Sequence, residues 1–328
     1  MPILPRVRIA HLPTPVEPLP RLSAFLGGPQ LWVKRDDQTG LALGGNKTRK
    51  LEFLVAEAQA QGARVLVTAG AVQSNHCRQT AAAAARFGFD CLLVLGGDPP
   101  EQASGNLLLD QLFRAETVFA PMEKRTQVFQ ESFDRLWQAG RRPYKIPYGG
   151  SNPTGAAGYA FAMHELLEQC GTDQPDWIVF ASSSGGTQAG LVAGARLFGY
   201  RGQVLGISVD EKARDLEARA CDLAGETASL ISPQEHFDSF KSLVNDDYLG
   251  GGYGVLGEAE ARAIHLFAGY EGLLLDPVYT GRAAAGLIDL IRKGFFKPGE
   301  KVLFWHTGGS PALFADQYNH MLSRISAG

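Results

Sequence analysis

The sequence predicts an α/β protein built from two open, parallel-sheet domains. Short runs of aliphatic and β-branched residues recur along the chain, at 64–68, 91–95, 177–181, 204–209 and 301–305. Such runs are typical of strands that are buried on both faces. Helical patterns separate the runs, and strands that alternate with helices pair in parallel through right-handed crossovers. The chain has 328 residues, which is enough for two lobes.

Helices are expected where apolar residues recur at intervals of three and four. This spacing predicts a helix at 51–58, which Gly62 would end in the left-handed conformation. The alanine-rich stretch 80–87 predicts another helix, closed by Gly88. A third helix is expected at about 159–168.

The division into lobes is expected at a loop. Residues 149–158 are rich in Gly, Pro and Asn, which are typical of turns. We therefore expect a small domain at 50–158 and a large domain made of 1–49 and 159–328. The polar stretch around 211–235 is expected to be the least regular part of the chain.

Composition and charge argue against several classes of protein. Hydrophobic residues make up 45% and charged residues 20%, close to the globular average, which argues against disorder. The formal net charge of -3 disfavours a protein dedicated to nucleic acids or membrane surfaces. No apolar run reaches the ~20 residues that span a bilayer, and we expect no secretory signal. The four cysteines show no CxxC or metal spacing, so we expect thiols in a reducing, cytoplasmic compartment.

The densest chemical signal is the segment 34–50. A strand-like run leads into the glycine-rich turn Gly44–Gly45, after which Lys47 opens the next helix. At a helix N-terminus the dipole disfavours the charged form of a lysine, which helps the free amine attack an aldehyde cofactor. The alternative is a solvated helix start formed by Lys47, Arg49 and Lys50.

Four polar residues in succession follow the strand expected at 64–68, namely Gln73, Ser74, Asn75 and His76. They lie at the carboxyl end of a parallel strand, where open α/β sheets bind ligands. One of them could simply cap the following helix, but a cap does not explain all four. Hydroxyl and amide side chains beside exposed helix-terminal amides suit a carboxylate.

A second strand-to-helix turn contains Ser184, Gly185, Gly186 and Thr187. Glycines let backbone N–H groups approach an anion and hydroxyl groups add donors, so this turn predicts a phosphate site. The turn lacks a Walker lysine and a GxGxxG pattern, which favours a simple phosphate monoester over a nucleotide. The alternative is a tight turn that binds nothing.

Two later turns also follow apolar strands. Tyr279 is a candidate proton donor or acceptor, although a half-buried tyrosine with a satisfied hydroxyl is commoner. Thr307 could bond a ring nitrogen or cap the helix that follows. The histidines are scattered and no catalytic serine motif occurs, so we expect neither a metal site nor Ser-His-Asp chemistry.

Together these segments resemble the ACC deaminase/D-cysteine desulfhydrase family, over about residues 12–314. That family has the tryptophan-synthase-β-like fold type II of pyridoxal 5′-phosphate enzymes. The resemblance implies that Lys47 forms the Schiff base with this cofactor, that Asn75 contacts its 3′-oxygen and that Thr307 meets its ring. The phosphate would be bound by Ser184, Gly185, Gly186 and Thr187.

The resemblance also implies the residues that act on the substrate. The substrate-binding residues would be Gln73, Ser74, His76 and Thr280. The catalytic residues would be Lys47, Ser74, Tyr253 and Tyr279. A small amino-acid substrate and a homodimer are expected, with no nucleic-acid or membrane partner.

Two positions separate activities within the family. ACC deaminases carry Glu and Leu where this chain has Thr280 and Thr307. The chain is similar instead to D-cysteine desulfhydrases, which implies β-elimination of D-cysteine to pyruvate, ammonia and hydrogen sulfide. L-cysteate sulfo-lyases share the motifs. That activity, ACC deamination, a non-catalytic amino-acid-binding protein and a nucleotide-dependent enzyme remain open as alternatives.

Overall fold

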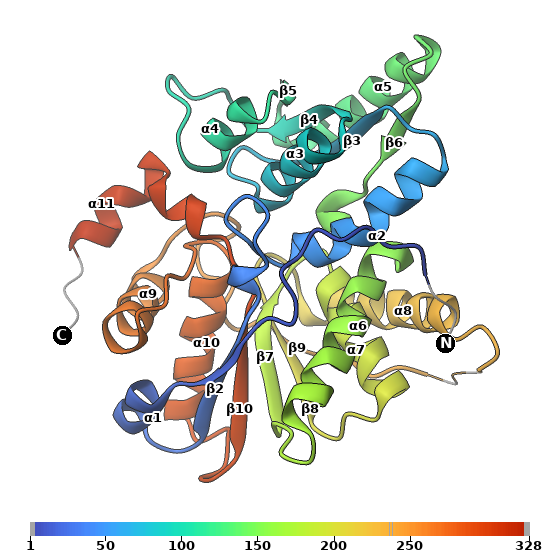
Figure 1. Ribbon diagram of the computed structural model, residues 1–328. Helices are drawn as coiled ribbons and strands as arrows, with labels where there is room; N and C mark the ends of the chain where they lie inside the picture. The colour runs from blue at the N-terminus through green and yellow to red at the C-terminus, as the bar shows by residue number, and fades with distance from the viewer. Residues whose placement is uncertain (1–3, 236, 238, 325–328) are drawn as a thin grey trace.

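The computed structural model describes residues 4–235, 237 and 239–324, which form two β-sheets (Figure 1). In spatial order the larger sheet consists of β1 (Val16–Pro18), β2 (Gln30–Arg35), β10 (Lys301–His306), β7 (Trp177–Ser182), β8 (Gln203–Ser208) and β9 (Leu243–Asn245). The smaller sheet consists of β5 (Glu116–Ala120), β4 (Asp90–Gly96), β3 (Val65–Ala71) and β6 (Pro143–Lys145).

Neighbouring strands pair in parallel in both sheets, except that β1 runs antiparallel to β2. Parallel pairing brings the carboxyl ends of adjacent strands to the same edge of a sheet. The loops that leave β7 and β10 therefore start side by side, which is where α/β sheets place their ligands.

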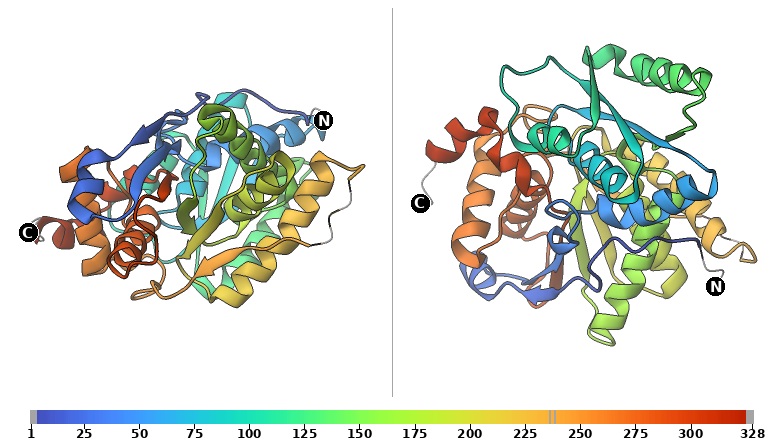
Figure 2. Two further views of the ribbon diagram at one scale, coloured as in Figure 1. Left: turned by 90° about the horizontal axis from the view of Figure 1, so that it is seen from below. Right: turned by 45° about the horizontal axis from the view of Figure 1, so that its top comes forward.

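Helices cover both faces of the larger sheet (Figures 1 and 2). One face packs against α1 (Pro20–Leu26), α9 (Glu258–Glu271) and α10 (Thr280–Arg292). The other face packs against α6 (Pro153–Cys170), α7 (Gly186–Phe198) and α8 (Ala213–Ile231). The sheet is thus buried on both sides, which explains why its strands are almost continuously apolar.

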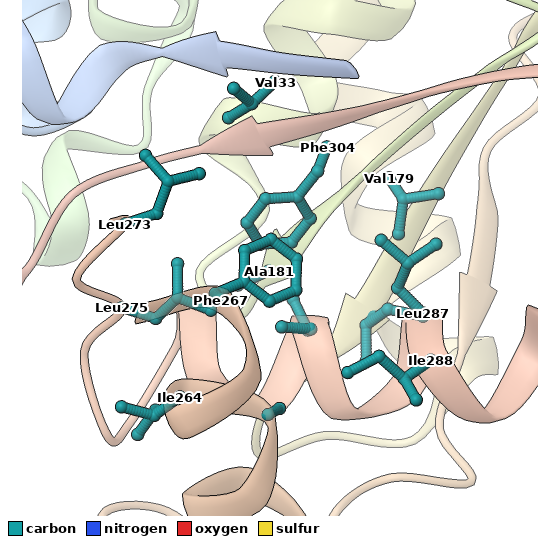
Figure 3. Packing of buried hydrophobic residues seen from close by; sticks show 14 of the residues in the cluster. Val33, Val179, Ala181, Ile264, Phe267, Leu273, Leu275, Leu287, Ile288 and Phe304 are labelled. Carbon is teal, nitrogen blue, oxygen red and sulfur yellow. The ribbon is translucent and has the colours of Figure 1, made fainter. Parts of the chain in front are cut away.

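The core under α9 and α10 shows how the larger sheet is held rigid. Val33, Phe304 and Val179 are neighbours in register across β2, β10 and β7. All three are fully buried against Phe267 of α9 and Leu287 of α10 (Figure 3). Each such side chain contributes roughly 1.5–3 kcal/mol on burial, so the strand ends that leave this core are well fixed.

The smaller sheet is covered in the same way. One face packs against α2 (Lys47–Ala60), α3 (Asn75–Phe87) and α4 (Gly105–Leu112), and the other against α5 (Arg125–Gln138). The remaining elements are α11 (Asp316–Arg324) and the short 3-10 helices η1 (Asp36–Gln38), η2 (Met122–Lys124), η3 (Tyr148–Gly150) and η4 (Ser310–Phe314). Among the described residues, no helix combines the length and the apolar character needed to cross a membrane.

The main sequence predictions of secondary structure are confirmed. The five predicted strands are present as β3, β4, β7, β8 and β10. Gly62 and Gly88 have the positive φ angles expected after helices, 65° and 74°. The helix expected at 80–87 begins earlier, at Asn75, because the Ser74 side chain caps it.

The predicted loop at 149–158 is wrong in its second half. Helix α6 begins at Pro153, directly after Asn152, whose side chain caps the helix. Gly158 of this helix allows close packing, because a Cβ at this position would lie 2.5 Å from the backbone oxygen of Arg49. The predicted helix at 159–168 is part of α6.

The expectation of irregular structure around 211–235 is also wrong, because most of this stretch forms α8. The buried residues of this helix are Leu216, Ala220, Leu223, Ala224, Thr227, Ala228 and Ile231. They recur at intervals of one, three and four, as an amphipathic helix requires. The stripe is hard to recognise in the sequence because four of its seven residues are alanine or threonine, among charged residues.

The proposed domain boundaries both fall inside helices. The boundary at 49/50 lies in α2 and the boundary at 158/159 lies in α6. The division into domains at 1–49, 50–158 and 159–328 stays a prediction.

Candidate active site

A cavity lies where loops from both sheets meet the start of α2. The loops that follow β3, β6, β7 and β10 all contribute to its wall. Of the site residues predicted from the sequence, the wall includes Lys47, Ser74, Asn75, His76, Ser184, Gly185, Thr187, Tyr279 and Thr307. The fold therefore brings together four motifs that are far apart in the sequence.

Lys47 is the first residue of α2 and is partly buried. Burial lowers the pKa of its amine to about 8, whereas the sequence suggested the helix dipole as the cause. The backbone N–H of Asn46 donates to the backbone oxygen of Thr307 over 2.9 Å, which fixes the turn before Lys47 to the end of β10. A lysine with a lowered pKa has far more free amine near neutral pH, so Lys47 is a candidate nucleophile.

The turn Ser184–Thr187 leads directly into α7, as predicted. The backbone N–H of Gly186 donates to Ser151 Oγ over 3.1 Å. The hydroxyl of Thr187 accepts a bond from Asn46 Nδ2 over 3.1 Å, which leaves its own proton free to donate. A helix start that presents backbone N–H groups and a hydroxyl donor is an anion site.

Lys50 lies against this turn and is only 1% exposed. Its Nζ donates to the backbone oxygen of Gly149 over 3.1 Å and lies 3.4 Å from Ser151 Oγ. Within the described part of the chain no carboxylate pairs with it, and burial, together with the charge of Lys47, holds its pKa well below the usual value. A buried amine without a counter-ion suits a bound phosphate, which would raise that pKa.

His76 is a neutral side chain in the cavity wall. Its Nε2 lies 2.9 Å from the hydroxyl of Thr68, which is also 3.0 Å from the backbone oxygen of Ile146. The buried Nδ1 has no side-chain hydrogen-bond partner among the described residues. Burial and the nearby lysines hold the pKa of His76 well below the usual value. Its expected role at a substrate carboxylate stays a prediction.

Two tyrosines form a hydrogen-bonded pair at the cavity. Tyr279 lines the cavity, and the hydroxyl of Tyr253 lies 2.6 Å from its hydroxyl. Burial raises the pKa of both groups well above the usual value, so both are protonated near neutral pH. The pair is therefore suited to donating a proton. Tyr148 adds a third hydroxyl to the wall, and burial raises its pKa as well.

Four of the predicted site residues lie outside the cavity wall: Gln73, Gly186, Tyr253 and Thr280. The Gln73 amide donates to the backbone oxygen of Ser104 over 3.0 Å and accepts from the backbone N–H of Asn106 over 2.8 Å. Thr280 is fully buried, and its hydroxyl donates to Asp276 over 2.8 Å. Both side chains are engaged inside the protein, and their substrate-binding roles stay predictions.

Sequence reasoning missed Tyr148, Gly149 and Lys50 as residues of the site. Tyr148 and Gly149 come from the loop after β6, where the sequence pattern predicts only a boundary between lobes. The sequence indicates Lys50 only as part of a solvated helix start. One signal was available, because a Tyr-Gly-Gly turn directly after a parallel strand lies at the ligand-binding edge of a sheet.

A comparison with protein-family models matches residues 7–308 to the pyridoxal-phosphate dependent enzymes. The chain belongs to this family. The matched range includes Lys47, the turn Ser184–Thr187 and every strand of both sheets. As a pyridoxal-phosphate dependent enzyme the chain has the predicted fold type II, and the non-catalytic and nucleotide-dependent alternatives are set aside.

Individual relatives agree with this assignment. The D-cysteine desulfhydrase of Klebsiella pneumoniae (strain 342) is 43% identical over 318 residues, which cover 95% of this chain and 96% of that protein. The crystal structure of an ACC deaminase homologue is 38% identical and has a TM-score of 0.89, covering 98% of this chain and 97% of that one. O-ureido-L-serine synthase, at 16% identity and a TM-score of 0.66, covers 96% of this chain and 94% of its own and shares the fold. The predicted family resemblance is thus confirmed.

The residues of the cavity fit pyridoxal 5′-phosphate. Lys47 supplies an amine with a lowered pKa, and the start of α7 supplies an anion site next to the buried Lys50. A Cβ at Gly186 would lie 2.4 Å from Ser151 Oγ and 2.8 Å from Lys50 Nζ, so only glycine permits this approach. An aldehyde that also bears a phosphate would use both features.

Proposed function

We propose that the protein is a lyase that eliminates the β-substituent of D-cysteine and releases pyruvate, ammonia and hydrogen sulfide. The observation that carries this proposal is a single cavity that joins Lys47, with its lowered pKa, to the anion site at the start of α7. The 43% identity to a D-cysteine desulfhydrase supports this choice of substrate. L-cysteate and ACC are the alternative substrates.

The bound cofactor would accept the electron density that remains when the Cα–H bond of the substrate breaks. The free amine of Lys47 would take up this proton, because its lowered pKa favours the uncharged form. Tyr279, with Tyr253 behind it, would give a proton to the departing sulfur, because the raised pKa of both keeps them protonated. Water would complete the reaction by hydrolysing the C–N bond of the product that remains after elimination, which gives pyruvate and ammonia.

Thr307 supports elimination over transamination. It lines the cavity at the end of β10 and is 7% exposed. We propose that its hydroxyl meets the ring nitrogen of the cofactor. A hydroxyl cannot keep that nitrogen protonated as a carboxylate would, which favours rapid loss of the β-substituent.

We also propose a cytoplasmic homodimer that acts on a small amino acid. The cysteines Cys77, Cys91, Cys170 and Cys221 are all free, which suits a reducing compartment. The dimer rests on the family resemblance. Light scattering of the purified protein is expected to give twice the chain mass of 35.3 kDa, and a single-chain mass would contradict it.

Absorption spectroscopy tests the cofactor site. The purified protein loaded with pyridoxal 5′-phosphate is expected to be yellow and to lose its visible band on borohydride reduction. Mass spectrometry of the reduced protein is then expected to find the cofactor on the peptide that contains Lys47. Cofactor attached to another lysine, or no band at saturating cofactor, would overturn the assignment.

A further inference from the structure

Arg78 is a fully buried cation of α3 that contacts Asn75, a residue of the cavity wall. Its Nη1 donates to Asn75 Oδ1 over 3.1 Å and to Asn106 Oδ1 over 2.8 Å. Its Nη2 donates to the backbone oxygen of Gly44 over 2.8 Å. Arg78 therefore connects a residue of the cavity wall with the turn that precedes Lys47.

These contacts determine the orientation of two side-chain amides. A guanidinium group can only donate, so Asn75 and Asn106 must both turn their oxygens toward Arg78. Asn106 is then left with Nδ2, which donates to Asn75 Oδ1 over 2.9 Å and to the backbone oxygen of Gln73 over 2.9 Å. Because the oxygen of Asn75 already accepts two bonds, its Nδ2 is the part of the amide available to the cavity.

We propose that Arg78 and Asn106 are positioning residues that hold Asn75 as a hydrogen-bond donor toward the ring oxygen of the cofactor. This inference rests on the proposed function. Pyridoxal 5′-phosphate carries an ionisable oxygen on the ring carbon next to the one that bears the aldehyde, and Asn75 shares its cavity with Lys47. An amide N–H is the group that such an oxygen accepts.

The charge of Arg78 strengthens this donor. All of its bonded acceptors are neutral, and the nearby Asp110 is fully buried with no partner for either oxygen in the described part of the chain. Burial raises the pKa of Asp110 to about 8, so this carboxyl is mostly neutral near pH 7. Burial lowers the pKa of Arg78 only to about 10, so it stays charged. A cation bonded to an amide oxygen polarises the amide and makes its N–H a better donor.

A double-mutant cycle separates this role from the bond between Arg78 and Gly44. The four proteins are wild type, Asn75→Ala, Arg78→Met and the double variant, and each is titrated with pyridoxal 5′-phosphate as apo-protein. Loss of one hydrogen bond corresponds to a ~10-fold rise in Kd, expected for each single variant. The double variant is expected to bind within ~2-fold of Asn75→Ala, because Arg78 acts through Asn75. The visible absorption maximum is expected to shift in the same direction in both single variants.

The other outcomes show whether the positioning role of Arg78 or the assignment of Asn75 to the cofactor site is wrong. Fully additive losses of affinity would overturn the positioning role and leave the cofactor site intact. An unchanged Kd and spectrum in Asn75→Ala would overturn the assignment of Asn75 to the proposed cofactor site itself. If Arg78→Met does not fold, the same cycle is run with Asn106→Ala, which removes the other donor to Asn75 Oδ1.

Asp110→Asn is the matched control, because it alters the neighbour of Arg78 without removing a bond to Asn75. The asparagine imitates the neutral carboxyl, so cofactor affinity and the absorption maximum are expected to match wild type. A shift as large as that of Arg78→Met would contradict the account, because it would mean that a charged Asp110 controls Arg78.

Discussion

The hydroxyl oxygens of Tyr253 and Tyr279 lie 2.6 Å apart, and only Tyr279 lines the cavity. Burial raises the pKa of both, so the pair holds protons that it can donate. Tyr279 is therefore the candidate donor to the departing sulfur, and Tyr253 is the residue that holds its hydroxyl in place.

This relationship predicts unequal losses in the two phenylalanine variants. Tyr279→Phe removes the donor, and the loss of general acid catalysis typically lowers kcat by ~100-fold or more. Tyr253→Phe removes only the partner of that donor and is expected to cost ~10-fold, about one hydrogen bond. Steady-state kinetics with D-cysteine measures both, and the cofactor band serves as the control for folding. A larger loss in Tyr253→Phe would reverse the assignment.

The lowered pKa of Lys47 predicts how fast cofactor attaches to apo-protein at each pH. Only the free amine attacks an aldehyde, so the rate is expected to rise with pH and to level off above about 8. Stopped-flow absorption measures this profile. A midpoint near 10.5, the value of an ordinary lysine, would show that burial does not activate Lys47.

Two lysine variants complete this test. Lys47→Ala is expected to lose the visible band and turnover. Lys50→Ala is expected to keep the band at saturating cofactor while binding it less tightly, because Lys50 lies against the anion site.

The close approach at Gly186 predicts that a larger residue there weakens cofactor binding. In Gly186→Val the new Cβ would lie 2.4 Å from Ser151 Oγ, which forces the turn away from its anion. We expect the Kd for pyridoxal 5′-phosphate to rise by ~10-fold or more, about the loss of one charge-assisted hydrogen bond. Gly269→Ala in α9 is the control, since a Cβ there meets nothing within 4 Å. Equal affinity in both variants would count against the turn as the phosphate site.

Thr280 and Thr307 are expected to determine the preference for D-cysteine over ACC as substrate. Thr280→Glu together with Thr307→Leu is expected to shift the product ratio from pyruvate, made from D-cysteine, toward 2-oxobutyrate, made from ACC. Thr307 lines the cavity, whereas Thr280 is buried and donates a hydrogen bond to Asp276. A glutamate at position 280 would place a second carboxylate beside Asp276. Thr307→Leu alone is therefore expected to produce most of the shift. No change in the ratio would remove both residues from the specificity account.

Much of the fold could be predicted because its strands are continuous apolar runs that are buried on both faces. Lys47 and the turn Ser184–Thr187 could be predicted as candidate site residues because each lies in a short segment of glycine, hydroxyl or lysine residues that directly precedes a helix. Helix α8 could not be found in this way, because its buried face consists largely of alanine and threonine. Its packing against the sheet, more than its local pattern, determines that it is a helix.

The rest of the site depends on contacts between distant segments. Nothing local in the sequence indicates that the loop of Gly149 and Ser151 covers Lys50. The ring of His76 contacts Thr68, and its predicted role at a carboxylate stays a prediction. The amide of Gln73 holds the segment of Ser104 and Asn106, and its predicted role at the substrate stays a prediction. In each case the partner comes from another element and is visible only in three dimensions.

The most direct test of the central claim is product release from four substrates assayed side by side: D-cysteine, L-cysteine, L-cysteate and ACC. Wild-type protein is expected to release pyruvate, ammonia and hydrogen sulfide in equal amounts from D-cysteine. Little product is expected from the other three substrates, and none from D-cysteine with Lys47→Ala. Efficient release of 2-oxobutyrate from ACC, or of sulfite from L-cysteate in preference to sulfide from D-cysteine, would contradict it.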